Sequence, residues 1–228
     1  MCTILLRLEP ASDEAVLLAA NRDEFRDRAA DDPAEIARGV FAGRDRVAGG
    51  TWLAVSGRGL AAVTNIADVA RRPDAPSRGQ LPLAALAGSL PADLRSFNAF
   101  NLLVVDAAGA RVLTHLGDGR ILGPTTLAAG LHVIVNAPFR HGDSARARHA
   151  ATLVESAPPG FALLTSHGRG TDDGLCHHGV AYGTVSSTVV ALDRALRLTR
   201  YLYRPGLPCQ TPTTDLTAAA RAVVSPGS

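Results

Sequence analysis

The chain has 228 residues, 46% of them hydrophobic and only 4% aromatic, so it can bury one substantial core built mainly from Ala, Leu and Val. All 23 basic residues are Arg, and the 21 acidic residues leave a net charge of +2, which argues against a nucleic-acid partner. No stretch approaches the roughly 20 apolar residues that span a bilayer, and the amino terminus does not read as a secretory signal. We therefore expect a cytoplasmic protein without a membrane span, and its oligomeric state stays open.

The first predicted element is a hairpin of two apolar runs, residues 2–8 and 15–20, joined by a polar segment with Pro, Ser and Asp. Cys2 opens this hairpin, and an initiator Met is commonly removed before a side chain this small. Cys2 would then carry a free α-amine, whose reference pKa of about 7.7 to 8.0 lets it take the proton of the thiol. The alternative interpretation is that Cys2 is an ordinary small apolar residue of a strand.

The polar run Asn21-Arg22-Asp23-Glu24 follows the second apolar run directly. In a hairpin the end of the second strand returns beside the start of the first, so Arg22 or Asp23 is expected next to Cys2. A guanidinium there would lower the pKa of the thiol, and a carboxylate could hold the α-ammonium in position. The alternative is a solvated turn.

Further elements follow in chain order, and hairpins outnumber helices among them. The predicted hairpins are 51–56 with 60–65 and 101–106 with 110–115, followed by strands at 131–135, 186–192 and 195–203. The predicted helices are 81–90, with Pro82 in its first turn, 144–155, and 213–224, capped by Asp215. This pattern predicts an α+β fold with a mostly antiparallel sheet, in one domain spanning 1–228 with a C-terminal extension from about residue 206.

Two asparagines end predicted apolar strands, Asn65 after Val63-Thr64 and Asn136 after Val135. Asn at such a position is a common turn former. The alternative is that both amides donate hydrogen bonds to an oxyanion, a role that contributes a few kcal/mol per donor in acyl transfer.

The segment Cys176-His177-His178 raises the question of a metal, because thiolate and imidazole suit zinc. No second Cys/His pair follows at a fixed spacing, and His167 is only loosely placed, so the sequence predicts neither a metal site nor a cofactor. Gly-rich stretches lack a following Lys-containing helix, which excludes a P-loop, and no Gly-x-Ser-x-Gly elbow is present.

Taken together, short motifs in a fixed order resemble the NRDE family, also called the transport-and-Golgi-organisation-2 family, over nearly the whole chain. The motifs are Met1-Cys2-Thr3-Ile4, Asn21-Arg22-Asp23-Glu24-Phe25, Gly49-Gly50-Thr51-Trp52-Leu53, Val63-Thr64-Asn65, Ser77-Arg78-Gly79, Phe100-Asn101-Leu102, Val135-Asn136-Ala137-Pro138, and Tyr182-Gly183-Thr184 with Ser187-Thr188-Val189. Many members carry Arg after the late Gly-Thr, where this chain has Val185.

That family is in turn similar to N-terminal nucleophile (Ntn) hydrolases of the cholylglycine hydrolase and penicillin V acylase type. The resemblance implies a four-layer αββα sandwich with Cys2 as the nucleophile, contacted by Arg22 and Asp23, and an oxyanion hole from Asn65 and Asn136. Expected substrate-binding residues are Asn21, Glu24, Trp52 and Arg78. The hydrolase order Arg-Asn-x-Asp does not superimpose on Asn-Arg-Asp-Glu, so the acidic role falls to Asp23 or Glu24.

The leading hypothesis is therefore a cofactor-free cysteine hydrolase that acts on a small molecule with a non-peptide amide or related acyl bond. A second hypothesis is a non-catalytic carrier for haem or an acylated ligand, because eukaryotic relatives are linked to haem movement and to acyl-CoA metabolism. In a haem carrier, Cys176, His177 and His178 could be ligands in the same cleft. A third possibility is a degenerate hydrolase fold with a structural role.

Overall fold

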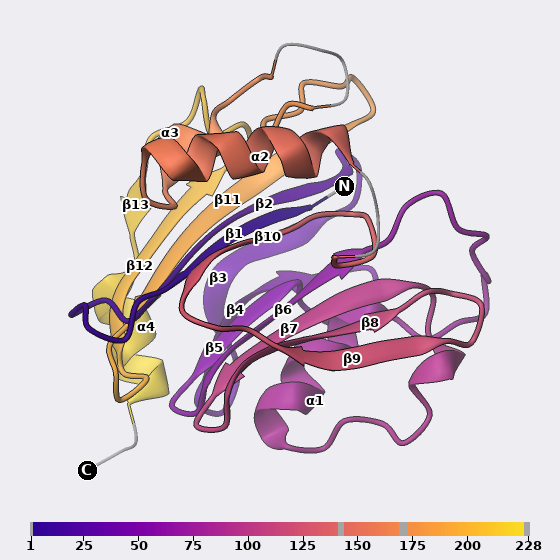
Figure 1. Cartoon of the computed structure of the whole chain (residues 1–228), viewed down its shortest axis with the longest axis horizontal. Coiled ribbons are helices and arrows are strands. Elements are labelled where there is room, and N and C mark those ends of the chain that lie inside the picture. Colours follow the sequence, from indigo (N-terminus) through magenta and orange to yellow (C-terminus); the bar gives the residue numbers. More distant parts are fainter. Residues whose placement is uncertain (1, 141–143, 169–172, 226–228) are drawn as a thin grey trace.

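The computed structural model describes residues 2–140, 144–168 and 173–225, and within them the strands form two stacked antiparallel sheets (Figure 1). The first sheet has the order β10 (Gly130–Ile134), β1 (Thr3–Leu8), β2 (Val16–Phe25), β11 (Tyr182–Leu192), β12 (Leu198–Pro205) and β13 (Thr214–Asp215). The second has the order β3 (Ala30–Ala37), β4 (Val40–Asp45), β5 (Leu53–Ser56), β6 (Gly59–Asn65), β7 (Phe100–Asp106), β8 (Gly109–His115) and β9 (Ile121–Thr126). Met1 and the tail at 226–228, which the sequence analysis included, lie outside the described residues.

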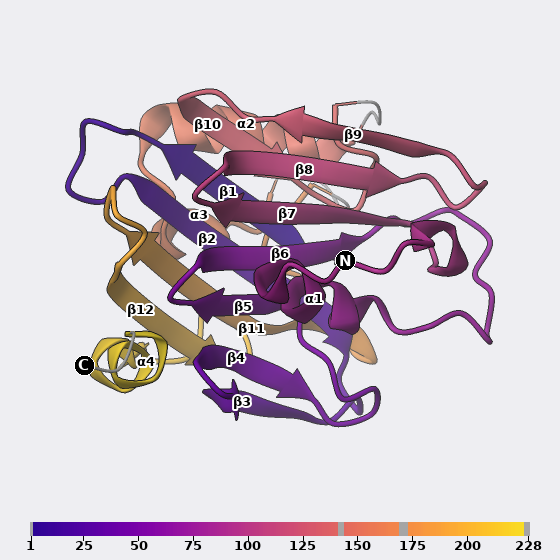
Figure 2. The ribbon, with the colours of Figure 1, turned by 90° about the horizontal axis from the view of Figure 1, so that it is seen from below.

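Helices lie against the outer faces of both sheets. On the first sheet, α2 (Ala145–Ser156) and α3 (Phe161–Leu164) cover β1, β2 and β11, as Figure 1 shows. On the second, α1 (Leu81–Ala87) follows the 3₁₀ turn η1 (Arg78–Gln80) and packs on β6 and β7, while η2 (Leu94–Ser96) precedes β7. Figure 2 shows α1 in front of the second sheet with the first sheet behind it. The mostly antiparallel α+β prediction is confirmed.

Alternation along the strands divides the apolar side chains between separate clusters. In β2, Leu18 and Ala20 pack into the core between the two sheets, whereas Leu17 and Ala19 pack under α2 and α3. In β1, even-numbered residues such as Ile4 likewise face the second sheet. Because successive side chains of a strand point to opposite faces, this parity determines which polar residues of β2 reach the space between the sheets.

The predicted N-terminal hairpin is present, with Thr3 opposite Asn21 and Leu8 opposite Val16. The expectation that its second strand stops near residue 20 is wrong, because β2 continues to Phe25 and pairs with β11 over its whole length. The Asn-Arg-Asp-Glu run is therefore part of a central strand instead of a turn. The neighbouring strand satisfies its backbone, which lets polar side chains occupy strand positions.

Several elements were not expected from the sequence: β3, β4, β9 and α3. The edge strands β3 and β9 contain Pro33 and Pro124, which a sequence pattern counts against a strand. Proline is tolerated in an edge strand because one side of the strand needs no hydrogen-bond donors. Sequence patterns therefore miss strands whose pairing is completed on only one side.

The C-terminal segment is integrated into the fold. The predicted helix begins at Thr217 instead of residue 213, because Thr214 and Asp215 form β13 at the edge of the first sheet. Asp215 still accepts a hydrogen bond from the Thr217 N–H at 2.8 Å. The helix α4 (Thr217–Val224) then packs on β12 and on β4 of the other sheet. No helix in the described ranges is both long and apolar enough to cross a membrane.

Candidate active site

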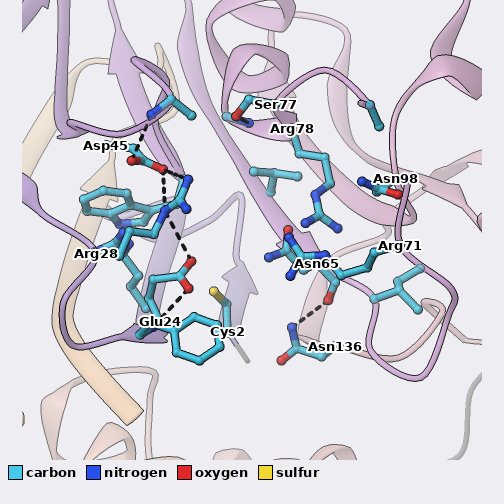
Figure 3. A pocket seen from close by; sticks show the side chains of 18 of the residues that line it. Cys2, Glu24, Arg28, Asp45, Asn65, Arg71, Ser77, Arg78, Asn98 and Asn136 are labelled. Carbon is cyan, nitrogen blue, oxygen red and sulfur yellow. Dashed lines mark hydrogen bonds and ion pairs between the residues drawn. The ribbon is translucent and has the colours of Figure 1, made fainter. Parts of the chain in front are cut away.

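A cavity of about 680 Å³ opens between the two sheets at the start of β1. From the first sheet it is lined by Cys2, Arg22 and Glu24, and from the second by Asn65 and the loop that leads to Arg78. Figure 3 shows the Cys2 sulfur pointing into this space, with Glu24 on one side and Asn65 and Asn136 on the other. Seven of the nine residues predicted for the site line the cavity: Cys2, Arg22, Asn65, Asn136, Glu24, Trp52 and Arg78.

The other two predicted site residues, Asn21 and Asp23, lie on the opposite face of β2. The Asn21 amide donates to the carbonyl oxygens of Leu164 and Leu175 at 3.0 and 2.7 Å and accepts from Ser187 Oγ. Both side chains are buried, at 1% and 3% exposure. Asn21 thus joins β2 to the segments over this face of the sheet, and does not line the cavity where substrate contact was expected.

Asp23 forms a buried ion pair behind the cavity. Its carboxylate accepts from Arg146 of α2 at 2.8 Å and from the Thr184 hydroxyl at 2.7 Å. Its backbone remains next to Cys2, because Thr3 pairs with Asn21 and places the preceding residue opposite Arg22. Of the two candidates for the acidic role, Glu24 lines the cavity with its side chain, whereas Asp23 contacts the nucleophile region through its backbone.

The Cys2 thiol is half-buried, and burial raises its pKa above the usual value. The negative charge of Asp23 raises the pKa further, while a hydrogen bond from the Asp23 backbone and the charge of Arg22 lower it. Arg22 therefore acts in the predicted direction, but desolvation outweighs its charge, so the net shift of the thiol pKa is upward. A neutral thiol needs a base to become a nucleophile.

Asn65 and Asn136 approach each other from different sheets. Asn136 follows β10, and its Nδ2 donates to the backbone oxygen of Asn65 at the end of β6, at 2.6 Å. Asn136 Oδ1 is buried and has no hydrogen-bond partner among the described residues. The Asn136 amide therefore retains one N–H and an unused acceptor at the cavity wall.

Asn101 fixes the position of the Asn136 segment, a role that the sequence analysis did not assign. This fully buried side chain on β7 donates to the carbonyl oxygens of Val135 and Ala137 at 3.0 and 2.9 Å and accepts from the Phe139 N–H at 3.0 Å. The Phe-Asn-Leu motif was the only sequence signal for Asn101. Sequence spacing does not predict its contacts with residues 135–139, which lie far along the chain.

Two close approaches at glycines, Gly50 against Gly79 and Gly43 against Trp52, position the segments that carry the Gly-Gly-Thr-Trp and Ser-Arg-Gly motifs. A Cβ on Gly50 would lie 2.4 Å from the backbone of Gly79, and the Thr51 N–H donates to Gly79 O at 2.9 Å. A Cβ on Gly43 would lie 2.6 Å from the Trp52 ring, whose other contacts include the Arg22 guanidinium at 4.2 Å from the ring centroid. These close approaches set Arg78 and Trp52 in the cavity wall.

The described lining is basic, with five arginines against two carboxylates: Arg22, Arg28, Arg71, Arg72, Arg78, Glu24 and Asp45. Arg28 is paired with Asp45 at 2.7 Å, and one guanidinium nitrogen of Arg72 donates to three carbonyl oxygens of residues 95–97. Burial, with a smaller contribution from the charge of Arg71, lowers the pKa of Arg78 to about 10. The charges of Cys2 and Glu24 oppose this shift, which places Arg78 within electrostatic reach of the nucleophile.

Four of these lining residues, Arg28, Asp45, Arg71 and Arg72, were not predicted from the sequence. Arg71 and Arg72 come from the loop after β6, which carries no periodic pattern, and Asp45 ends a strand that was not expected. These residues are recognised as part of the site only by their shared location in the cavity wall, because isolated arginines are frequent throughout this chain.

The suggested haem ligands Cys176, His177 and His178 do not line this cavity. They surround a separate hollow of about 250 Å³ with His167, on the loop before β11. The idea that they act in the same cleft as Cys2 is therefore wrong. No histidine lines the larger cavity within the part of the chain that the structure describes.

Comparison with known proteins places these features in a family. The sequence model described as Transport and Golgi organisation 2 matches residues 1–159. The Transport and Golgi organization 2 homolog of Mus musculus is 31% identical over 162 residues, covering 60% of this chain and 57% of that protein. The homologs of Bos taurus and Homo sapiens are 33% and 31% identical over the same coverage. The chain thus spans somewhat more than half the length of these curated relatives, and it belongs to the Transport and Golgi organisation 2 family.

Proposed function

We propose that the cavity is the active site of an N-terminal cysteine hydrolase that cleaves a non-peptide amide or a related acyl bond. The observation that carries the proposal is that Cys2 lies in a cavity whose opposite wall presents two asparagines. Removal of Met1 would leave an α-amine beside the thiol, whose raised pKa requires such a base.

In the proposed reaction, Cys2 Sγ bonds to the substrate carbonyl carbon as the thiol proton passes to the α-amine. Asn65 and Asn136 donate hydrogen bonds to the oxyanion of the tetrahedral intermediate. The C–N bond breaks as the α-ammonium gives its proton to the leaving nitrogen. Water then attacks the thioester with the α-amine as base, which releases the carboxylic acid and restores the thiol.

The arrangement of helices on the outer faces of two stacked sheets supports an Ntn-type four-layer sandwich in a single domain. In such a sandwich the nucleophile begins a central strand of one sheet, and Cys2 occupies the position directly before β1. The Ntn relationship is part of the proposal, together with a cytoplasmic location, with which the three free thiols agree.

The basic lining favours an acyl substrate with an anionic group. Among the described residues, Arg71 has no ion pair or hydrogen-bond partner, and the half-buried Arg78 donates to one carbonyl oxygen, that of Ala99, at 2.8 Å. A carboxylate, phosphate or sulfonate between these two guanidinium groups would relieve their mutual repulsion. The Arg22–Trp52 pair offers a flat surface for the remainder of the substrate.

The competing function is a carrier that holds an anionic acyl ligand or haem in the same cavity without turnover. The basic lining fits this function equally well. The measurement that separates the two functions is whether the acyl group becomes attached to Cys2 and is then released. A haem bound there would have to use Cys2 as its sulfur ligand or bind without a histidine from the described lining.

The test is a screen of N-acyl amides and thioesters, each with an anionic group and paired with its neutral analogue. Intact mass spectrometry of the protein is expected to show loss of Met1 and an acyl adduct on Cys2, with turnover abolished in Cys2→Ala. Arg71→Gln is expected to reduce the preference for anionic members and to leave turnover of neutral ones unchanged. Retention of Met1, or equal turnover by Cys2→Ala, would overturn the hydrolase. Tight binding without an adduct would support the carrier.

A further inference from the structure

Four side chains with metal-binding atoms meet outside the cavity: His167, Cys176, His178 and Cys209. One nitrogen or sulfur atom from each lies within 4.8 Å of all the others. Cys176 Sγ is 3.6 Å from Cys209 Sγ, and His178 Nε2 is 3.4 and 3.2 Å from these two sulfurs. The His167 ring packs edge-on to His178 with 4.8 Å between centroids.

The three separations among Cys176, Cys209 and His178 are close to the edges of a tetrahedral zinc site, and the His167 nitrogen, within 4.8 Å of the other ligand atoms, lies at the fourth corner. With Zn–S bonds of about 2.3 Å and Zn–N bonds of about 2.0 to 2.1 Å, a regular tetrahedron has S···S of about 3.8 Å and S···N of about 3.6 Å. A two-cysteine, two-histidine donor set in this geometry is typical of zinc, because soft thiolate and imidazole ligands select it over hard cations such as magnesium and calcium.

The backbone brings these residues together from positions far apart in the sequence. Both Leu175 and Cys176 donate their N–H to Ser166 O, at 2.8 and 2.9 Å, which places Cys176 beside the residue that precedes His167. A Cβ on Gly174 would lie 2.5 Å from the backbone oxygen of His167, so only glycine lets the two limbs approach this closely. The site is therefore built on hydrogen-bonded backbone.

The fourth ligand comes from the end of β12. Gly206 donates its N–H to Val185 O at 2.7 Å, and Arg204 donates to Pro208 O, so the segment with Cys209 is held against β11. His177, between the two ligands of its own segment, instead pairs through its backbone with Thr184 at 2.9 Å. Alternation along the chain thus directs Cys176 and His178 to the cluster.

A disulfide between Cys176 and Cys209 is the chief alternative for two neighbouring thiols. Their sulfurs are 3.6 Å apart, compared with about 2.05 Å in a disulfide, and both cysteines are free. A disulfide would also leave unexplained why His178 points its Nε2 at both sulfurs and why His167 packs against it.

We propose that His167, Cys176, His178 and Cys209 bind one Zn²⁺ in a closed, structural site. All four positions come from protein side chains, so the metal has no open position for a substrate. Binding would release the two thiol protons and join the loop before β11 to the end of β12. The site lies behind the cavity, because Leu175 O accepts from Asn21 and His177 N donates to Thr184, the partner of Asp23.

The test uses the full chain purified from cells grown with added zinc, under reducing conditions. Metal analysis is expected to find roughly one zinc per chain. The zinc should be lost from Cys176→Ser/Cys209→Ser and from the exposed single variant His178→Gln. His177→Gln is the matched control, since it changes the intervening histidine outside the donor set, and it should keep the metal. Cobalt added to the metal-free protein should give the absorption of tetrahedral thiolate coordination, absent in the double variant.

Three outcomes would overturn the proposal. The first is wild-type protein with no more zinc than the double variant, combined with no cobalt spectrum. The second is a Cys176–Cys209 disulfide found by non-reducing mass spectrometry in protein kept reduced. The third is equal zinc loss from His177→Gln and His178→Gln. None of these depends on hydrolysis, so failure here is distinct from failure of the hydrolase proposal.

Discussion

The two faces of β2 carry polar residues in equal number but use them differently. Toward the second sheet, Arg22 and Glu24 line a cavity and keep part of their hydrogen-bonding capacity. Toward α2 and α3, Asn21 and Asp23 are buried with protein partners, and the Cys/His cluster lies just beyond them. The four consecutive residues 21–24 thus alternate between the two faces: two of them line the cavity and the other two form buried hydrogen bonds and an ion pair.

This difference teaches that a polar run in a strand is not one functional unit. The face with satisfied partners contributes rigidity, because a buried polar group is costly to leave unpaired. The open face can bind a ligand because its groups keep unused donors and charge. The following variants separate the two contributions, beginning with the largest expected effect.

Asp23→Ala should lower the free energy of unfolding by about 3–5 kcal/mol, because Arg146 would remain as a buried charge without its partner. The matched control is Glu24→Ala, on the open face, which should cost less than about 1 kcal/mol since its ion pair with Arg28 is long and partly exposed. Urea denaturation measures both. Equal losses in the two variants would show that the faces do not differ in the way described.

Asn136→Ala should reduce kcat by about 10²–10³-fold if its amide stabilises an oxyanion. KM should change little, because the amide would act mainly in the transition state. Steady-state kinetics on a substrate found in the acyl screen measure this split. A rise in KM at unchanged kcat would assign Asn136 to ground-state binding instead.

Asn21→Ala should cost about 1–3 kcal/mol, since the carbonyls of Leu164 and Leu175 and the Ser187 hydroxyl would lose their shared partner. Asn21→Asp should be more destabilising, although it is almost the same shape, because a carboxylate would face two carbonyl oxygens. Thermal unfolding gives the order. Asn21→Asp at least as stable as Asn21→Ala would contradict the assigned hydrogen bonds.

The pH dependence of Cys2 alkylation should reveal both faces at once. Arg22 lowers and Asp23 raises the pKa of the thiol, so Arg22→Gln should move the midpoint of alkylation to higher pH and Asp23→Asn to lower pH. The wild-type midpoint should lie above that of an ordinary thiol, because burial disfavours the thiolate. Peptide mass mapping after timed iodoacetamide treatment isolates Cys2 from the other cysteines. A shared direction for the two variants would refute this account.

Local sequence was sufficient for hairpins whose apolar runs are complete on both strands. The pairing of β1 with β2 and of β7 with β8 follows from alternation and a turn signal, and so does the proximity of Cys2 to Arg22. The edge strands β3 and β9 were not predicted, because their sequences contain proline and their strand geometry depends on pairing with a neighbouring strand. The ordered motifs identified the family although each one alone is short.

What the sequence by itself determined is the identity of the reactive groups and the local pairing that sets Cys2 beside β2. Only the tertiary structure decided which side of β2 each polar residue serves, because strand parity has meaning only once both sheets are in place. The tertiary structure also brought Cys209 to within 3.6 Å of Cys176, across 33 positions of sequence. No regular spacing in the sequence predicts the Cys/His cluster, because the pairing of β11 with β12 brings its residues together.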